Sequence, residues 1–174
     1  MTDINFSGAD QKSGEDGIAR PSQASYEFIE LLFFAYRDFI SEPDEILAGY
    51  EFGRAHHRVL HFVDRNPGLS VADLLEILKI TKQSLARVLK QLVDRGFVEQ
   101  RAGERDRRQR LLHATPEGQN LARTLAGIQA KRMEHALVRL DPAQRAAAAE
   151  FLARLINDTE RGDVMKIVKK DETA

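Results

Sequence analysis

Five arginines lie within the fifteen residues RAGERDRRQRLLHAT (101–115), in a chain whose formal net charge is only −1. Guanidinium groups bind phosphate through charge-assisted, paired hydrogen bonds, so this cluster of arginines could bind a polyanion. Residues 79–110 carry ten Lys and Arg against four acids, a net charge of +6, whereas the rest of the chain carries 16 basic against 23 acidic residues, or −7. A basic block inside an acidic chain is typical of a nucleic-acid face, although a solvated surface can have the same composition.

The residues before this loop predict a helix-turn-helix. Ser70, with Asp73 three residues later, has the capping-box spacing at the start of a short helix. Thr81 is the expected cap of a second helix, over 82 to about 95. One face of the second helix is apolar at helical spacing and comprises Leu85, Val88, Leu89, Leu92 and Val93. In a helix-turn-helix, this second helix enters the major groove of DNA.

The other face of the second helix carries the side chains that we expect to contact DNA. Gln83 and Ser84 lie in the first turn, where a recognition helix reaches base edges. Gln can pair with adenine through two hydrogen bonds, and Ser can bond several bases. Lys82, Arg87 and Lys90 are placed to bind phosphates, which fix the position of the protein and make its affinity salt-dependent.

After the second helix, the spacing of the apolar residues changes to one typical of short strands. FVEQR (97–101) and RLLHA (110–114) predict a β-hairpin around the arginine-rich loop, which makes the unit a winged helix-turn-helix. The expected DNA contacts of this wing are Arg105, Asp106, Arg107 and Arg108. An arginine at the wing tip can reach the minor groove, where A·T-rich segments carry enhanced negative potential. Asp106 could hold the Arg108 guanidinium through a charge-assisted hydrogen bond, with simple surface pairing as the alternative.

Four further segments have helical patterns: 26–40, 53–68, 116–138 and 142 to about 160. The centre of the first, residues 31–36, is apolar on all sides, which in a small protein suggests burial against a partner chain. Pro43 is expected to end or kink that helix. The predicted fold class is therefore mostly α with a small β-hairpin wing.

The segment LSVADLLEILKITKQSLARVLKQLVDRGFVEQR, followed by DRRQRLLHATPEG, resembles the core of the MarR family of bacterial transcription regulators. The matching features are the L-x-x-L helix, the LVDRGFVEQR turn, the D-x-R wing signature at Asp106 and Arg108, and the TPEG opening of the next helix. The resemblance covers residues 30–160 in the family's order of elements, and ELLFFAYRDFI and GRAHHRVLHFV are further similar to the PetP-like branch.

The resemblance implies a homodimer that binds double-stranded DNA at a pseudo-palindromic operator, most often as a repressor. The first helix and the last two helices would form the dimer interface, Arg108 would be the minor-groove arginine, and Asp106 would be its partner. Two-fold symmetry places the half-sites about 10 base pairs apart. The expected division is a disordered tail (1–22), an N-terminal dimerisation helix region (23–52), a winged helix-turn-helix (53–114), C-terminal dimerisation helices (115–162) and a loose tail (163–174).

The resemblance also implies a small anionic aromatic effector, bound between the dimer region and the winged domain. The candidate lining residues are Tyr36, Phe39, His57, Arg58 and His61. Ordinary core packing is the alternative for each of the aromatic residues.

His57 and His61, four residues apart, could instead reach one metal ion or respond to pH. Only Asp64 lies close by as a further ligand, so we expect no metal site and no cofactor. The chain has no cysteine, which rules out disulfides and thiol redox sensing within it.

No catalytic motif was found, and we expect no enzymatic activity. A protein-interaction module that keeps the fold without binding DNA is the rival function, but the basic helix and the intact wing signature count against it. The chain has neither a secretory signal nor an apolar run of membrane-spanning length, so we expect a cytoplasmic protein that does not contact membranes.

Overall fold

A computed structural model describes residues 20–103 and 106–169, and it divides the chain into two units, 1–35 and 36–174. The predicted tail 1–22 falls almost entirely outside the described residues, as does the predicted wing contact Arg105. Within the described ranges, no helix is both long and apolar enough to cross a bilayer. The predicted division into five segments stays a prediction.

Helix α1 (Gln23–Ala48) begins in the first unit and ends in the second. In the first unit every described side chain is exposed, including the apolar Leu31, Leu32 and Phe33 at 56%, 47% and 68%. The helix does not end at Pro43, which lies buried inside it. Burial of the proline ring offsets part of the cost of the backbone hydrogen bond that proline cannot donate.

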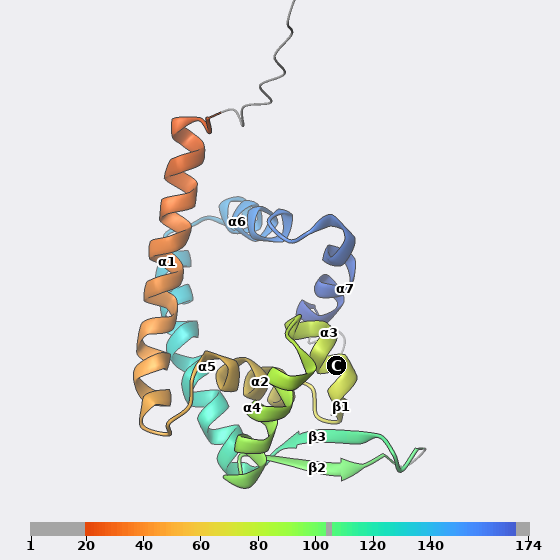
Figure 1. Cartoon of the computed structure of the whole chain (residues 1–174). Coiled ribbons are helices and arrows are strands. Elements are labelled where there is room, and N and C mark those ends of the chain that lie inside the picture. The colour runs from red at the N-terminus through yellow and green to blue at the C-terminus, as the bar shows by residue number, and fades with distance from the viewer. Residues whose placement is uncertain (1–19, 104–105, 170–174) are drawn as a thin grey trace, which may run out of the picture. The chain divides into compact units, whose positions relative to one another are not determined.

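The second unit holds the remaining helices and a three-stranded sheet (Figure 1). Its elements are α2 (Arg54–Arg65), β1 (Leu69–Ser70), α3 (Val71–Leu78), α4 (Lys82–Asp94), β2 (Val98–Ala102), β3 (Arg110–Ala114), α5 (Pro116–Leu137), α6 (Pro142–Arg154) and α7 (Asp158–Val168). The sheet is antiparallel, in the order β1-β3-β2. Leu112 of β3 is paired with Leu69 on one side and with Gln100 on the other. The predicted fold class is confirmed.

The helix starts lie where the sequence predicts them, because polar side chains satisfy the first free backbone amides. Ser70 Oγ accepts from Asp73 N at 3.1 Å, and the Asp73 carboxylate accepts from Ser70 N at 3.1 Å. Thr81 Oγ1 accepts from Ser84 N at 3.1 Å. Both predicted caps of the helix-turn-helix are therefore confirmed.

The core of the second unit joins the helix-turn-helix to the wing and to α5. It is built on leucines that are almost completely buried and come from five elements: Leu60, Leu74, Leu85, Leu92, Leu112 and Leu125. Each such side chain contributes roughly 1.5–3 kcal/mol by its removal from water. The orientation of α4 is thus fixed by its apolar face, which leaves its polar face to solvent.

Gly118 allows the start of α5 to lie against the turn between α4 and β2. A Cβ atom at this position would lie 2.0 Å from the carbonyl oxygen of Phe97. Thr115 closes the same contact, since its Oγ1 donates to Gly96 O at 2.6 Å and its backbone N donates to Phe97 O at 3.1 Å. The TPEG motif therefore attaches α5 to the base of the wing.

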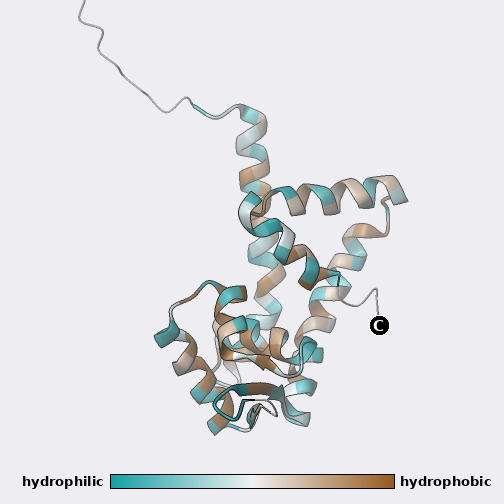
Figure 2. Cartoon of the chain, turned by 90° about the vertical axis from the view of Figure 1, so that its right-hand side faces the viewer, coloured by the Kyte–Doolittle hydropathy of each residue, from teal (hydrophilic) through white to brown (hydrophobic). Residues whose placement is uncertain are grey.

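The end of the chain differs from the prediction. The sequence predicts one helix from 142 to about 160 and a loose end, but α6 stops at Arg154 and α7 extends to Val168. The Arg161 guanidinium donates to the carbonyls of Ala153, Arg154 and Ile156, which satisfies acceptors left free at the end of α6. Figure 2 shows α6 as a mixture of apolar and polar positions, and it has no buried residue.

Candidate nucleic-acid interface

The two faces of α4 are divided as the sequence predicts. Its leucines and Val88 are buried in the core, whereas Lys82, Gln83, Arg87 and Lys90 are exposed. Ser84 is half-buried, and its Oγ accepts a hydrogen bond from Thr81 Oγ1 at 2.8 Å, so its own hydroxyl proton stays available to another acceptor. The exposed face combines hydrogen-bonding side chains in the first turn with cations along the helix.

The wing is a hairpin closed by backbone hydrogen bonds. Gly103 N donates to Gln109 O and Gln109 N donates to Asp106 O, both at 3.0 Å. The chain doubles back tightly here, because a Cβ atom on Gly103 would lie 2.9 Å from Asp106 O. The loop presents Asp106, Arg107 and Arg108 with exposed side chains.

Asp106 makes a different contact from the one predicted. Its Oδ1 accepts from the backbone N–H of Arg108 at 2.9 Å, and the two side chains form no ion pair in the described wing. A short acidic side chain that bonds the backbone two residues later stabilises a turn. The carboxylate therefore shapes the loop, and the Arg108 guanidinium is left to extend from it.

The described cations of the basic segment fall into two groups. The first group is paired with carboxylates: Lys79 with Glu160, Lys90 with Asp94, Arg95 with Glu51, and Arg101 with Glu99. The second group makes no ion pair with any described residue and comprises Lys82, Arg87, Arg107, Arg108 and Arg110. This second group lies on α4 and the wing, where unneutralised positive charge can attract phosphate.

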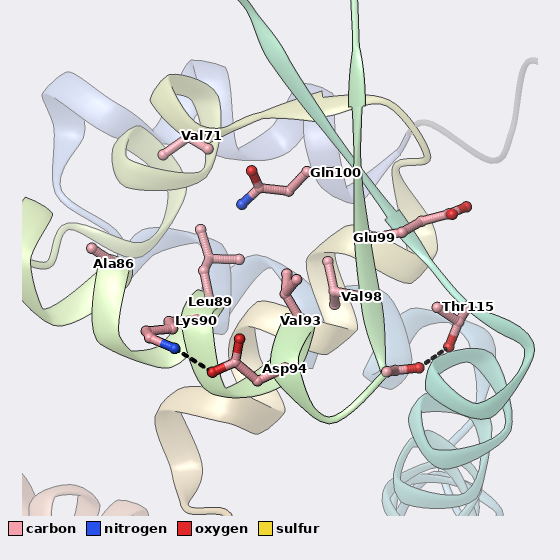
Figure 3. A pocket seen from close by; sticks show the side chains of 11 residues that line it. Val71, Ala86, Leu89, Lys90, Val93, Asp94, Val98, Glu99, Gln100 and Thr115 are labelled. Atoms are coloured by element: carbon pink, nitrogen blue, oxygen red, sulfur yellow. Dashed lines mark hydrogen bonds and ion pairs between the residues drawn. The ribbon is translucent and has the colours of Figure 1, made fainter.

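A pocket of about 630 Å³ separates α4 from β2 (Figure 3). Leu89 and Val93 of the helix and Val98 of the strand form an apolar floor, and the Gln100 side chain extends over it. Lys90 and Asp94 stand on the helical rim, joined by a hydrogen bond. The pocket thus marks the space between the recognition helix and the wing.

A second pocket, of about 270 Å³, brings together all five residues predicted to line an effector site. Tyr36, Phe39, His57, Arg58 and His61 surround it, with Ile40, Asp44, Arg54 and Gln129. Arg54 is neutralised by Asp44 at 2.8 Å, but Arg58 makes no ion pair with a described residue. The pocket therefore combines aromatic walls with one unpaired guanidinium.

Burial lowers the pKa of both His57 and His61 below the ordinary histidine value. Neighbouring positive charge adds to the effect, from His61 on His57 and from Arg65 on His61. Both imidazoles are therefore neutral at neutral pH. In the part of the chain that the structure describes, no three His, Cys, Asp or Glu side chains gather as a metal-binding group.

Sequence reasoning missed the role of His56, which joins α2 to α4. Its Nδ1 accepts from Gly53 N at 3.1 Å, so its Nε2 carries the proton and donates to Gln91 Oε1 at 2.7 Å. The ring stacks on Phe52 with 4.6 Å between centroids. The only sequence signal was the position of His56 three residues after Gly53, where a side chain can cap the start of α2.

The helices α3 and α4, followed by the β2–β3 hairpin, define a winged helix-turn-helix protein, and comparison with known proteins identifies the family. The MarR family profile matches residues 50–109. The chain is 46% identical over 133 residues to the HTH-type transcriptional regulator PetP of Rhodobacter capsulatus, a match that covers 76% of this chain and 80% of that protein. The chain therefore belongs to the MarR family of transcription regulators, which confirms the predicted family and the prediction of no enzymatic activity.

Two solved structures show the same fold at low sequence identity. Streptococcus pneumoniae FabT in complex with DNA aligns with a TM-score of 0.67 at 18% identity, over 75% of this chain and 94% of that one. Bordetella bronchiseptica BpsR, whose DNA binding is regulated by 6-hydroxynicotinic acid, aligns with a TM-score of 0.57 at 21% identity. The alignment covers 75% of this chain and 99% of that one.

Proposed function

We propose that this regulator binds double-stranded DNA sequence-specifically in the cytoplasm, as a homodimer on a pseudo-palindromic operator, and represses transcription there. The observation that carries the proposal is the group of cations without carboxylate partners on α4 and the wing. A buried apolar face holds α4 so that its polar face points outward. The similarity of the fold to FabT, whose structure was solved with DNA, supports DNA binding.

In this mechanism α4 lies in the major groove. Gln83 and Ser84 contact base edges, while Lys82, Arg87 and Lys90 contact phosphates. Arg107, Arg108 and the sequence-predicted Arg105 contact the minor groove or its phosphates. Asp106 acts indirectly, because it holds the loop that presents Arg108.

The dimer is supported by apolar surface that a single chain leaves exposed. Leu31, Leu32 and Phe33 in α1 are about half exposed or more, as are Leu152 of α6 and Leu155 just after it. Exposed apolar patches of this kind are typical of protein interfaces. The first helix and the C-terminal helices are therefore the proposed dimerisation elements, as the sequence predicts.

The second pocket is the proposed effector site. Tyr36 and Phe39 line it with aromatic rings, and the unpaired Arg58 guanidinium offers paired donors to a carboxylate. A small anionic aromatic molecule has the matching chemistry, and the effector named for BpsR, an aromatic acid, is of this class. Titration with benzoate and with uncharged benzamide tests the site. Benzoate should bind more tightly, and Arg58→Gln should remove the difference; equal affinities would contradict the assignment.

Selection of DNA from the organism's own genome tests the central proposal. Wild-type protein should enrich discrete sites that contain two related half-sites about one helical turn apart. A flat enrichment profile would contradict sequence-specific binding. It would then favour the rival function, a winged fold that binds a protein partner.

A further inference from the structure

One of the cations proposed to bind phosphate is already paired with a carboxylate of the same chain. Lys90 Nζ donates to Asp94 Oδ2, four residues later on the same helix, and both side chains are exposed, at 74% and 55%. Lys82, Ala86, Lys90 and Asp94 follow one another at intervals of four, so the carboxylate continues the line of the DNA-facing residues. Figure 3 places the pair at the rim of the pocket between α4 and β2.

Helix stability does not explain this carboxylate. Asp94 is the last residue of α4, where the helix dipole disfavours negative charge. A lysine that precedes its acid by four residues is also the weaker order for such a pair. Glu150 and Arg154 in α6 have the favourable order at 2.7 Å and provide the contrast.

We infer that Asp94 competes with DNA phosphate for Lys90 and so limits the affinity of the recognition helix for DNA. The inference rests on the proposed function. When the protein is free, the ammonium is held by the carboxylate of its own helix. When DNA approaches, Lys90 must exchange this carboxylate for a phosphate, and Asp94 stays at the interface as an unpaired negative charge.

Two measurable effects follow. Loss of an exposed pair of this kind should tighten DNA binding about two- to fivefold. A lysine that is unpaired before binding also neutralises a phosphate more completely when DNA binds. Each phosphate that is fully neutralised steepens the plot of log affinity against log salt concentration by about 0.9. Asp94→Asn should therefore bind more tightly and with a steeper salt dependence than the wild type.

The experiment is a double-mutant cycle on the full chain. The probe is a fluorescent duplex of about 30 base pairs, long enough for two half-sites, taken from the sequence that the wild type enriches most strongly. Affinity is measured by anisotropy at several salt concentrations for the wild type, Asp94→Asn, Lys90→Met and the double variant. Glu150→Gln removes the matched pair on α6 and should leave affinity unchanged.

The cycle separates competition for Lys90 from a general change of charge. The inference predicts that Asp94→Asn tightens binding by a larger factor in the wild-type background than in the Lys90→Met background, where only the repulsion between the carboxylate and DNA is removed. Equal tightening in both backgrounds, or no tightening at all, would overturn it. A wild type that selects no discrete sequence would instead overturn the proposed function and this inference together.

Discussion

His56 Nε2 donates a hydrogen bond to Gln91 Oε1 across 2.7 Å, and this bond joins α2 to the recognition helix α4. The histidine is buried, and its other nitrogen is occupied by the backbone of Gly53. The position of α4 relative to α2 therefore depends on a polar contact as well as on apolar packing.

Replacing Gln91 with Ala should lower the free energy of unfolding by about 1–3 kcal/mol, because a buried imidazole N–H loses its acceptor. Urea denaturation followed by circular dichroism measures the change. Gln83→Ala, on the exposed face of the same helix, should stay within about 0.5 kcal/mol of the wild type. Equal effects of the two substitutions would show that the bond adds nothing.

Gly118→Ala should destabilise the protein by about 1–3 kcal/mol or more, because the new methyl group would overlap the carbonyl of Phe97. Gly127 provides the control within the same helix, since a Cβ atom there meets nothing within 4 Å. Gly127→Ala should stabilise by roughly 0.5–1 kcal/mol, as the helix preference for alanine is gained without a clash. Thermal and urea unfolding measure the stability of both variants. A Gly118→Ala variant as stable as the wild type would contradict the close approach of Gly118 to the Phe97 carbonyl.

Stability should fall as the pH drops below the ordinary histidine pKa. Burial lowers the pKa of His57 and His61 in the folded state, so the unfolded chain binds protons first. The stability that the two neutral histidines contribute is fully present above the pKa of the unfolded chain, about 6.5. It is lost as the pH falls through the lower pKa values of the folded state. Urea denaturation at several pH values measures the free energy of unfolding. Plotted against pH, this free energy should have a smaller slope for the His57→Gln, His61→Gln double variant than for the wild type. An unaltered slope in the double variant would contradict this cause.

Leu152→Lys should shift the protein from dimer to monomer, because it places a charge on apolar surface proposed to be buried between chains. Sedimentation at several protein concentrations measures the association. Ala147→Lys, at an exposed position on another side of α6, is the control and should leave the dimer intact. A wild type that sediments as a monomer would contradict the proposed assembly.

Local signals in the sequence were enough to locate much of the fold and of the site. Caps such as Ser70 and Thr81 mark helix starts because they bond nearby amides, and the apolar spacing along α4 decides which face remains exposed. The five predicted pocket residues also meet in one cavity, since His57, Arg58 and His61 share α2 and face Tyr36 and Phe39 of α1.

Features that depend on distant partners could not be predicted in this way. Strand β1 has two residues, too few for an alternating pattern, and exists through its pairing with β3. The break after α6 has no Gly or Pro to mark it and depends on the Arg161 guanidinium. Asp106 had two possible donors near it, the backbone and the side chain of Arg108, and spacing alone did not distinguish them.

Salt-dependent DNA binding of Arg108→Ala beside the wild type tests the central claim most directly. The probe is the duplex that the wild type selects, and Arg123→Ala, an exposed arginine on α5, is the control. The account predicts that Arg108→Ala loses about 1–3 kcal/mol of binding free energy, with the salt slope reduced by about 1, while Arg123→Ala binds like the wild type. Equal affinity and slope for all three proteins would contradict the assignment of the wing to DNA.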